Sequence, residues 1–318
     1  MDIFFIHFVL CNITIGLFVL ILLCMKRIFK HCLTPRMQFN LWIPFTISLL
    51  VPFLPVSFST LSTKMQDLFH PLAHFSHTVH TTNTSEYTSS STNQIYDYAI
   101  SMRTRFPAYI STIFCVIWGI GMFVMLFSFV RSLVLLHHMR RTANLMQDKR
   151  IHAIYMTCLS ELQLRKSIPL YSSSIIDTPV STGILRPAIF LPLHCISNFE
   201  EQEIRYILLH ELMHCYYKDA IFNYCMNIIR ILYWFHPLIW LITKEFYTER
   251  ELACDTSVLR SLGANEQISY GVTLLHFVDK QTNTPLSLLN NLSENAKQMK
   301  RRILNIKQHQ PLTIQKKL

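Results

Sequence analysis

Hydrophobic and polar positions divide the chain into an apolar amino-terminal part and a mixed carboxyl-terminal part. Three long apolar runs cover residues 3–25, 39–58 and 108–136. Each is about as long as a helix that crosses the hydrocarbon core of a bilayer. The prolines of the second run fit a membrane helix, because neighbouring groups can satisfy the freed backbone. The pattern therefore predicts three transmembrane helices within 1–137, followed by a globular domain over 138–318.

Basic residues next to these runs predict their orientation. Lys26 and Arg27 follow the first run and "HHMRR" follows the third, whereas the Ser/Thr-rich segment 59–107 contains three basic residues. Lys and Arg concentrate in cytoplasmic loops, so we expect 59–107 and the amino terminus outside and the globular domain in the cytoplasm. A cleaved signal peptide is the alternative for the first run. It is disfavoured because no basic residues precede the run and no small-residue cleavage site follows it.

Composition narrows the function. The chain has 318 residues, 51% of them hydrophobic, and a net charge of +10. Direct nucleic-acid binding is not expected, because no dense basic tract is interleaved with aromatic residues. None of the nine cysteines falls in 59–107 and no CxxC pair occurs, which predicts reduced thiols without structural disulfides. His70 and His74 in this segment have metal-ligand spacing, but surface imidazoles are the favoured interpretation.

The globular part has a mixed α+β pattern. A helix is predicted over 142–166, and two or three short strands over 168–192, with a turn at Gly183. A further helix is predicted to start near Ser197, because Ser197 and Glu200 have the spacing of a capping box. This helix carries the most informative motif of the chain.

That motif is "HELMH", residues 210–214. Residues four apart lie on one face of a helix, so His210 and His214 can offer imidazole nitrogens to one zinc ion. Glu211 lies beside them, where it can take a proton from a water molecule whose pKa zinc lowers to about 7. The alternative is a solvated helix face that carries two histidines. A third ligand would favour zinc.

A candidate third ligand lies in "TERELACD". Glu251 would complete a His₂Glu site with one position open, which is typical of catalytic zinc. Asp255 can accept a hydrogen bond from a ligating histidine, and Asp219, five residues after His214, is a second candidate for this role. Glu249 competes for the metal, but it should lie on a different face of the helix.

The stretch 220–242 is almost apolar enough to be a fourth span. A single crossing would place His214 and Glu251 on opposite sides of the membrane. Two crossings need about 40 residues, and 36 separate His214 from Glu251. If the zinc site exists, this stretch is expected to be a helix broken near Pro237, packed in the domain core or lying along the inner membrane face. A real fourth span is the alternative.

Four segments carry a family resemblance: "HELMHCYYKD", "YWFHPLIW", "ERELACD" and "MKRRILNI". They resemble the BlaR/MecR-type regulatory metallopeptidases, the membrane sensor-transducers of β-lactam resistance. The resemblance implies three transmembrane helices and a cytoplasmic, gluzincin-like zinc metallopeptidase domain in a bacterial plasma membrane. It implies Zn²⁺ held by His210, His214 and Glu251, with Glu211 as general base. It also implies cleavage of a cytoplasmic regulatory protein, such as a transcriptional repressor, and of the chain itself.

The sequence departs from the sensors at its end. After "KQHQPLTIQKKL" there is no further apolar run, and no Ser-x-x-K motif is followed by Lys-Thr-Gly. The chain is therefore expected to lack its own acylation site for a β-lactam, as a truncated sensor or a naturally short relative. A separate sensor subunit or a homodimer would then supply the signal.

Two other functions stay open. The chain can be a non-catalytic membrane signalling protein with a vestigial zinc site, although structural zinc usually has four protein ligands. A small transporter is the other alternative, and the few polar residues within the runs argue against it. The basic tail segment 284–303 is expected to contact anionic lipid rather than to be a self-cleavage linker. His236 and Tyr247 are weak candidates for stabilising an oxyanion.

Overall fold

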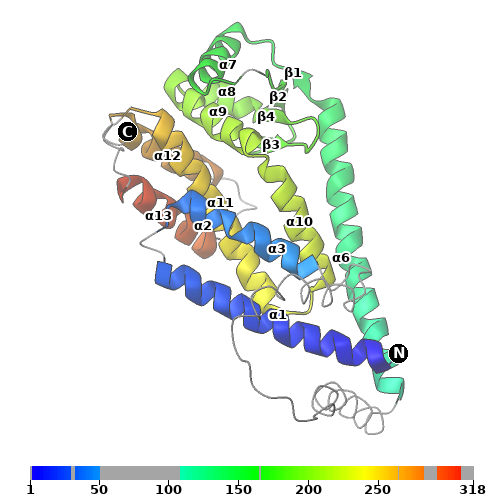
Figure 1. Ribbon diagram of the computed structural model, residues 1–318. Helices are drawn as coiled ribbons and strands as arrows, with labels where there is room; N and C mark the ends of the chain where they lie inside the picture. The colour runs from blue at the N-terminus through cyan, green and yellow to red at the C-terminus, as the bar shows by residue number, and fades with distance from the viewer. Residues whose placement is uncertain are drawn as a thin grey trace, which may run out of the picture. The chain divides into compact units, whose positions relative to one another are not determined.

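The computed structural model describes residues 2–29, 33–50, 108–164, 166–263, 265–282 and 292–308. Its helices, shown in Figure 1, are α1 (Asp2–Phe29), α2 (Pro35–Asn40), α3 (Trp42–Leu50), α6 (Ala108–Thr142), α7 (Lys149–Glu161), α8 (Leu193–Asn198), α9 (Glu201–Tyr216), α10 (Asp219–Leu232), α11 (Pro237–Ser261), α12 (Glu266–Thr282) and α13 (Leu292–Gln308). Its strands are β1 (Asn144–Leu145), β2 (Leu170–Ser173), β3 (Val180–Thr182) and β4 (Ala188–Pro192).

The chain packs as two compact units. One comprises Met1–Phe18 and Ile47–Gly121, and the other comprises Val19–Thr46 and Met122–Leu318. By packing, the end of α1 and all of α2 therefore belong with the carboxyl-terminal part of the chain. The predicted boundary at residue 137 separates the membrane region from the cytoplasmic domain and is not a boundary of packing. It stays a prediction.

One described helix is long and apolar enough to cross a membrane. It covers Thr112–Thr142 within α6, and the rest of the described chain buries none of its most apolar window. The other two predicted spans stay predictions, because the side chains of 2–11 and all of 51–58 lie outside the described residues. The predicted outer segment 59–107, with its histidines, lies outside them as well.

The second unit contains a small mixed sheet in the order β1-β2-β4-β3. Strand β2 runs parallel to β4, and β3 pairs with β4 in an antiparallel hairpin. Gly183 lies in the hairpin turn with φ of +108°, and an added Cβ there would lie 2.4 Å from the carbonyl oxygen of Arg186. Only glycine adopts this conformation without strain. Three of the four strands come from 168–192, as predicted, and β3 forms the edge beside α9.

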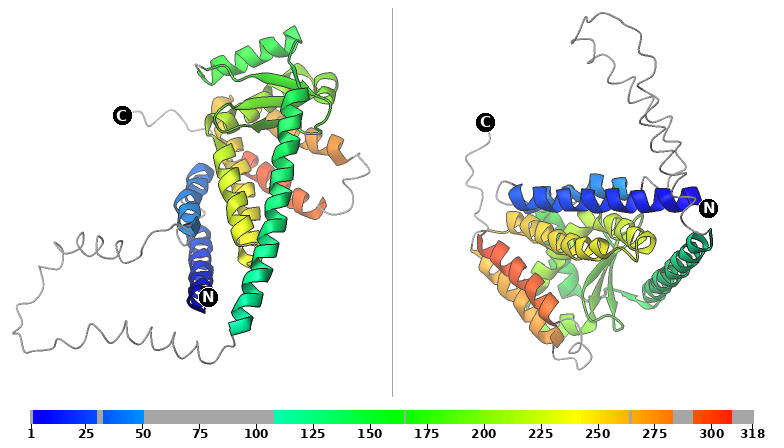
Figure 2. Two further views of the ribbon diagram at one scale, coloured as in Figure 1. Left: turned by 90° about the vertical axis from the view of Figure 1, so that its right-hand side faces the viewer. Right: turned by 90° about the horizontal axis from the view of Figure 1, so that it is seen from below.

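Helix α9 is the central helix of this unit. Leu208, Leu209 and Leu212 are fully buried, in a core that also receives side chains from α7, β4, α11 and α12. Figure 2 shows α11, α12 and α13 side by side, and α11 packs against both α9 and α13. The α9 and α11 faces that meet here are those that carry "HELMH" and "ERELACD".

Three local predictions need correction. The helix predicted over 142–166 is shorter, because β1 precedes it and it ends at Glu161. The capping box is formed by Glu200 and Glu203, since the Glu200 backbone N–H donates to the Glu203 carboxylate at 3.0 Å. Ser197 lies inside the separate short helix α8 instead, and its hydroxyl donates to the backbone of His194.

The stretch 220–242 is interrupted, as predicted. Helix α10 ends at Leu232, and α11 begins at Pro237, whose ring is accommodated in the first turn of a helix. At about 1.5 Å per residue, the 14 residues of α10 reach roughly 21 Å, short of the hydrocarbon core. It is not among the described helices that could cross a membrane.

Candidate metal centre

The two histidines of α9 converge on one point. His210 and His214 lie one turn apart on the face of α9 that meets α11, and their rings are nearly perpendicular at 89°. Their Nε2 atoms are 3.2 Å apart. Both side chains are about 11% exposed, so the pair is shielded from bulk water but remains open to a cavity.

Glu251 brings a carboxylate to the same point from α11. Its Oε2 lies 3.3 Å from Nε2 of His210, and its Oε1 lies 3.8 Å from Nε2 of His214. Zinc binds nitrogen and oxygen at about 2.0–2.2 Å in a tetrahedron, which sets its ligand atoms roughly 3.3–3.6 Å apart. The three residues therefore fit a zinc ion. Arg250 donates to Oε1 at 2.6 Å, whereas Oε2 is the oxygen that faces His210.

Each histidine has a hydrogen-bond partner at its other nitrogen. Nδ1 of His214 lies 2.8 Å from the Asp219 carboxylate. The chain reverses at Lys218, which has a left-handed backbone (φ 56°) and places Asp219 in the first turn of α10. Nδ1 of His210 lies 3.0 Å from the hydroxyl of Tyr270 and 3.4 Å from Asp255. Metal-ligating histidines usually have such partners, which fix the ring and its tautomer.

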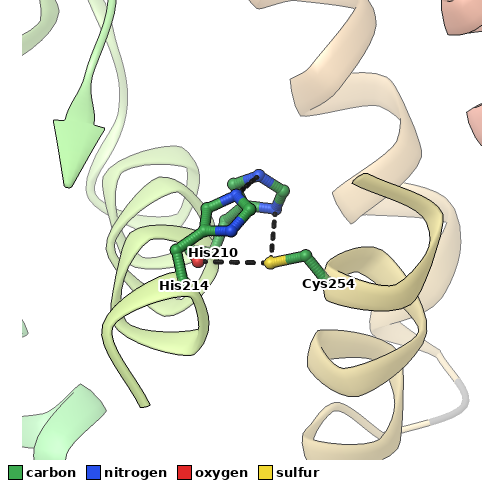
Figure 3. Close-up of side chains that lie close together, drawn as sticks. All are labelled: His210, His214 and Cys254. Carbon is green, nitrogen blue, oxygen red and sulfur yellow. Dashed lines mark hydrogen bonds between the residues drawn. The ribbon is translucent and has the colours of Figure 1, made fainter. Parts of the chain in front are cut away.

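Cys254 also lies against the histidines, and Figure 3 shows its sulfur beside His210. His210, His214 and Cys254 form a group whose donor atoms all lie within 4.8 Å of one another. The sulfur, however, is 3.5 Å from Nδ1 of His210 and 3.4 Å from its backbone oxygen. That nitrogen already contacts Tyr270. The Glu251 carboxylate, in contrast, lies near the Nε2 atoms of both histidines, whose Nδ1 atoms keep their partners.

Charges around the centre keep the carboxylates ionised. Burial acts against ionisation of Glu251, but Arg250, the histidines and Arg302 lower its pKa well below the usual range. Burial also opposes ionisation of Asp255, whose pKa Arg302 lowers. Burial alone would lower the pKa of His214, yet Cys254, Asp219 and Glu251 raise it to about 10. The carboxylates of Glu251 and Asp255 are therefore ionised in the folded protein.

Glu211 lies beside this centre and lines the same cavity. The cavity has a volume of about 260 Å³, and its wall includes the histidines, Glu251 and the edge strand β3 at Val180 and Ser181. Glu211 is 8% exposed. Among the described residues, none hydrogen-bonds to its carboxylate, so the group can accept a proton from a molecule in the cavity.

Other residues considered from the sequence lie elsewhere. Glu249 faces away from the histidines and pairs with Lys26 and the indole of Trp42. His236 and Tyr247 are not among the residues that line the cavity, whereas Tyr270, Arg250 and Arg302 are. The described cysteines are unpaired.

The structure contradicts in part the prediction that the basic tail segment contacts anionic lipid. Arg301 and Arg302 of α13 make bidentate ion pairs with Glu245 and Asp255 of α11. Lys297 and Lys300 are exposed. For these two arginines the prediction is wrong, because a run of basic residues on a helix does not reveal which of them pair with carboxylates of a neighbouring helix. For the two lysines it stays a prediction. The segment 283–291 lies outside the described residues.

Comparison with known proteins identifies the family. The family model described as BlaR1 peptidase M56 matches residues 6–306. The chain belongs to this family. It is 30% identical over 306 residues to the regulatory protein BlaR1 of Bacillus licheniformis, covering 95% of this chain and 51% of that protein.

Two further M56 relatives come from Staphylococcus aureus. The methicillin resistance protein mecR1 is 26% identical over 253 residues, covering 75% of this chain and 40% of that protein. The regulatory protein BlaR1 is 24% identical over 305 residues, covering 91% and 48%. The chain thus spans about half the length of the relatives it matches, and the resemblance expected from the motifs is confirmed.

Proposed function

We propose that the chain is a zinc-dependent membrane endopeptidase that cleaves a cytoplasmic regulatory protein. One observation carries this proposal: the Nε2 atoms of His210 and His214 and an oxygen of Glu251 converge, and Glu211 borders the same cavity. Three protein ligands leave a position open, as in catalytic zinc sites. The names of its relatives, which refer to regulation and to methicillin resistance, support a regulatory role.

His210, His214 and Glu251 would hold the zinc, with Asp219 and Asp255 supporting the histidines. When bound, zinc would polarise the scissile carbonyl and make water more acidic. Glu211 accepts the proton of a water molecule that attacks this carbonyl carbon, and a tetrahedral carbon forms. The carboxyl of Glu211 then gives the proton to the amide nitrogen, and the C–N bond breaks. Arg302 lines the cavity and is proposed as the donor to the oxyanion, in place of His236 and Tyr247.

The substrate is proposed to bind in an extended conformation. Strand β3 is the edge of the sheet, and its residues Val180 and Ser181 border the cavity beside Glu211. An edge strand has one row of backbone groups that does not pair within the sheet, and a peptide can add to it as a further strand. A protein segment that is locally unfolded, in a repressor or in the chain itself, would fit this requirement.

We place the catalytic part in the cytoplasm of a bacterium, bound to the plasma membrane by several helices. The candidate span of α6 supports this, because Arg140 and Arg141 lie in its last turn. A sensor subunit or a second copy of the chain is proposed as the source of the signal.

Glu211→Gln tests the proposal, with Glu201→Gln as a matched change on the exposed surface of α9. Glu211→Gln should keep about one zinc per chain, because it removes only the base. It should lower cleavage of a co-expressed repressor or of casein by roughly 10²–10⁴-fold, and Glu201→Gln should cleave normally. Zinc content is measured by atomic emission on protein purified in detergent.

A vestigial zinc site makes a different prediction. In that case the wild-type protein binds zinc but cleaves no substrate. His210→Ala should then lose zinc and leave the cleavage assay unchanged. Cleavage by Glu211→Gln at the wild-type rate would exclude Glu211 as the base. Absence of zinc from the wild-type protein would exclude the metal centre itself.

A further inference from the structure

We propose that Tyr270 is the positioning residue of His210, and that α13 supports the metal centre through Arg302 and Asp255. This inference rests on the proposed metal site. It assigns a role to α12 and α13, two helices that lie outside the "HELMH" and "ERELACD" motifs. Arg302, Asp255, Tyr270 and His210, which we call the His210 relay, come from four different helices.

The direction of the hydrogen bonds follows from the chemistry of the groups. The Tyr270 hydroxyl lies 2.6 Å from Oδ1 of Asp255 and 3.0 Å from Nδ1 of His210. A phenol has one hydrogen, and an ionised carboxylate only accepts. Tyr270 therefore donates to Asp255, and its oxygen accepts from Nδ1–H of His210. The lone pair of His210 is then on Nε2, which faces His214 and Glu251.

Arg302 holds the far end of the relay. Its Nε and Nη2 donate to the two oxygens of Asp255, both at 2.7 Å. Asp255 is fully buried and Arg302 is 13% exposed. A buried carboxylate needs such a partner, because without one its ionised form loses its solvation. Arg302 thus keeps Asp255 available as the acceptor for Tyr270.

The two histidines differ in which helices provide the partners of their Nδ1 atoms. His214 contacts Asp219 directly, five residues further along the chain. His210 depends on Tyr270 of α12 and, through Asp255, on α13. A displacement of α13 therefore weakens the support of His210 and leaves that of His214 in place. By thermodynamic linkage, metal binding must then stabilise the docked position of α13.

Tyr270→Phe tests the first link, since it removes one hydroxyl and keeps the ring. Tyr206→Phe is the matched control: its ring is also buried, lies 5.9 Å from that of Tyr270, and its hydroxyl accepts from Gln202. Zinc affinity is measured by chelator competition, and the visible spectrum is recorded for the cobalt-substituted protein, both on the full chain in detergent.

We expect Tyr270→Phe to weaken zinc binding by roughly 10- to 100-fold and to change the cobalt spectrum. Tyr206→Phe should change neither. Equal affinities and spectra for Tyr270→Phe and wild type would overturn the inference while leaving the peptidase proposal intact. A wild-type protein that binds no zinc would instead overturn the proposed function.

Arg302→Met tests the second link against Arg301→Met. Both arginines belong to α13 and both make bidentate ion pairs with α11, but Arg301 binds Glu245, away from the cavity. Hydrogen exchange of α13 is followed with and without zinc. Zinc should slow exchange in wild type and in Arg301→Met and should have little effect in Arg302→Met. Exchange in wild-type α13 that zinc leaves unchanged would refute the link.

Discussion

At the scale of single residues, Asp219 is the group on which His214 depends. Its Oδ2 lies 2.8 Å from Nδ1 of His214, and its Oδ1 faces Arg36 of α2 at 3.9 Å. Asp219→Ala should therefore weaken zinc binding by roughly 10- to 100-fold, as expected for the partner of a ligating histidine. Asp177→Ala, at an exposed position, is the control. Chelator competition measures both, and equal affinities would show that Asp219 does not orient His214.

The sequence supplied some residues of the centre and missed others for a physical reason. His210, Glu211 and His214 lie within little more than one turn of α9, so helix periodicity brings them together. Asp219 was found by its closeness in sequence, although the reversal at Lys218 is what returns it to His214. Glu251 was found as an acidic residue on a second helix. Tyr270 was missed because a tyrosine in an amphipathic helix usually packs in a core. Arg302 and Arg301 have the same sequence signal, and only the fold distinguishes the residue that contacts Asp255.

At the scale of elements, a buried ion pair joins the end of α1 to α11, the helix that carries Glu251. Lys26 of α1 contacts Glu249, which also accepts from Trp42 Nε1 at 2.6 Å, and Lys26 lies 3.8 Å from the Trp42 ring centre. Both charged side chains are at most 7% exposed. The pair therefore anchors α1 and α3 to α11 two residues before Glu251.

Breaking this pair from one side should be costly. Glu249→Leu or Lys26→Met leaves an unpaired buried charge and should lower the free energy of unfolding by about 3–5 kcal/mol, whereas the double variant should be close to wild type. Arg301 and Glu245, each about a third or more exposed, form the comparison pair, whose loss should cost under about 1 kcal/mol. Denaturant titration in detergent measures these changes. Additive single effects in the double variant would show that the pair does not interact.

The helix boundaries were predicted best where two distant residues had to reach the same site. The interruption near Pro237 followed from the requirement that His214 and Glu251 share one ion, and α10 and α11 confirm it. The capping residue was misplaced because Ser197 and Glu200 match a local pattern that Glu200 and Glu203 fulfil in the structure. A helix of six residues, such as α8 before α9, is too short to show a periodicity in the sequence.

At the scale of the whole molecule, the metal centre requires α9 and the end of α11 to lie on one side of the membrane. Positions 197 and 260 are exposed and lie before α9 and near the end of α11. Ser197→Cys and Arg260→Cys, each in a background without the native thiols, should both be protected from an impermeant maleimide in intact spheroplasts. Both should react after lysis, because the catalytic part is proposed to be cytoplasmic. Ser90→Cys, in the predicted outer segment, should react before lysis.

The pattern of labelling separates two errors. If Ser197→Cys and Arg260→Cys react together in intact cells, the domain is outside: the orientation is wrong and the shared centre survives. If only one of them reacts, 220–242 crosses the membrane and the two helices cannot hold one ion. The convergence of His210 and Glu251 at 3.3 Å predicts that the second result will not occur. Labelling of only one of the two cysteines would therefore exclude both the proposed topology and the proposed peptidase function.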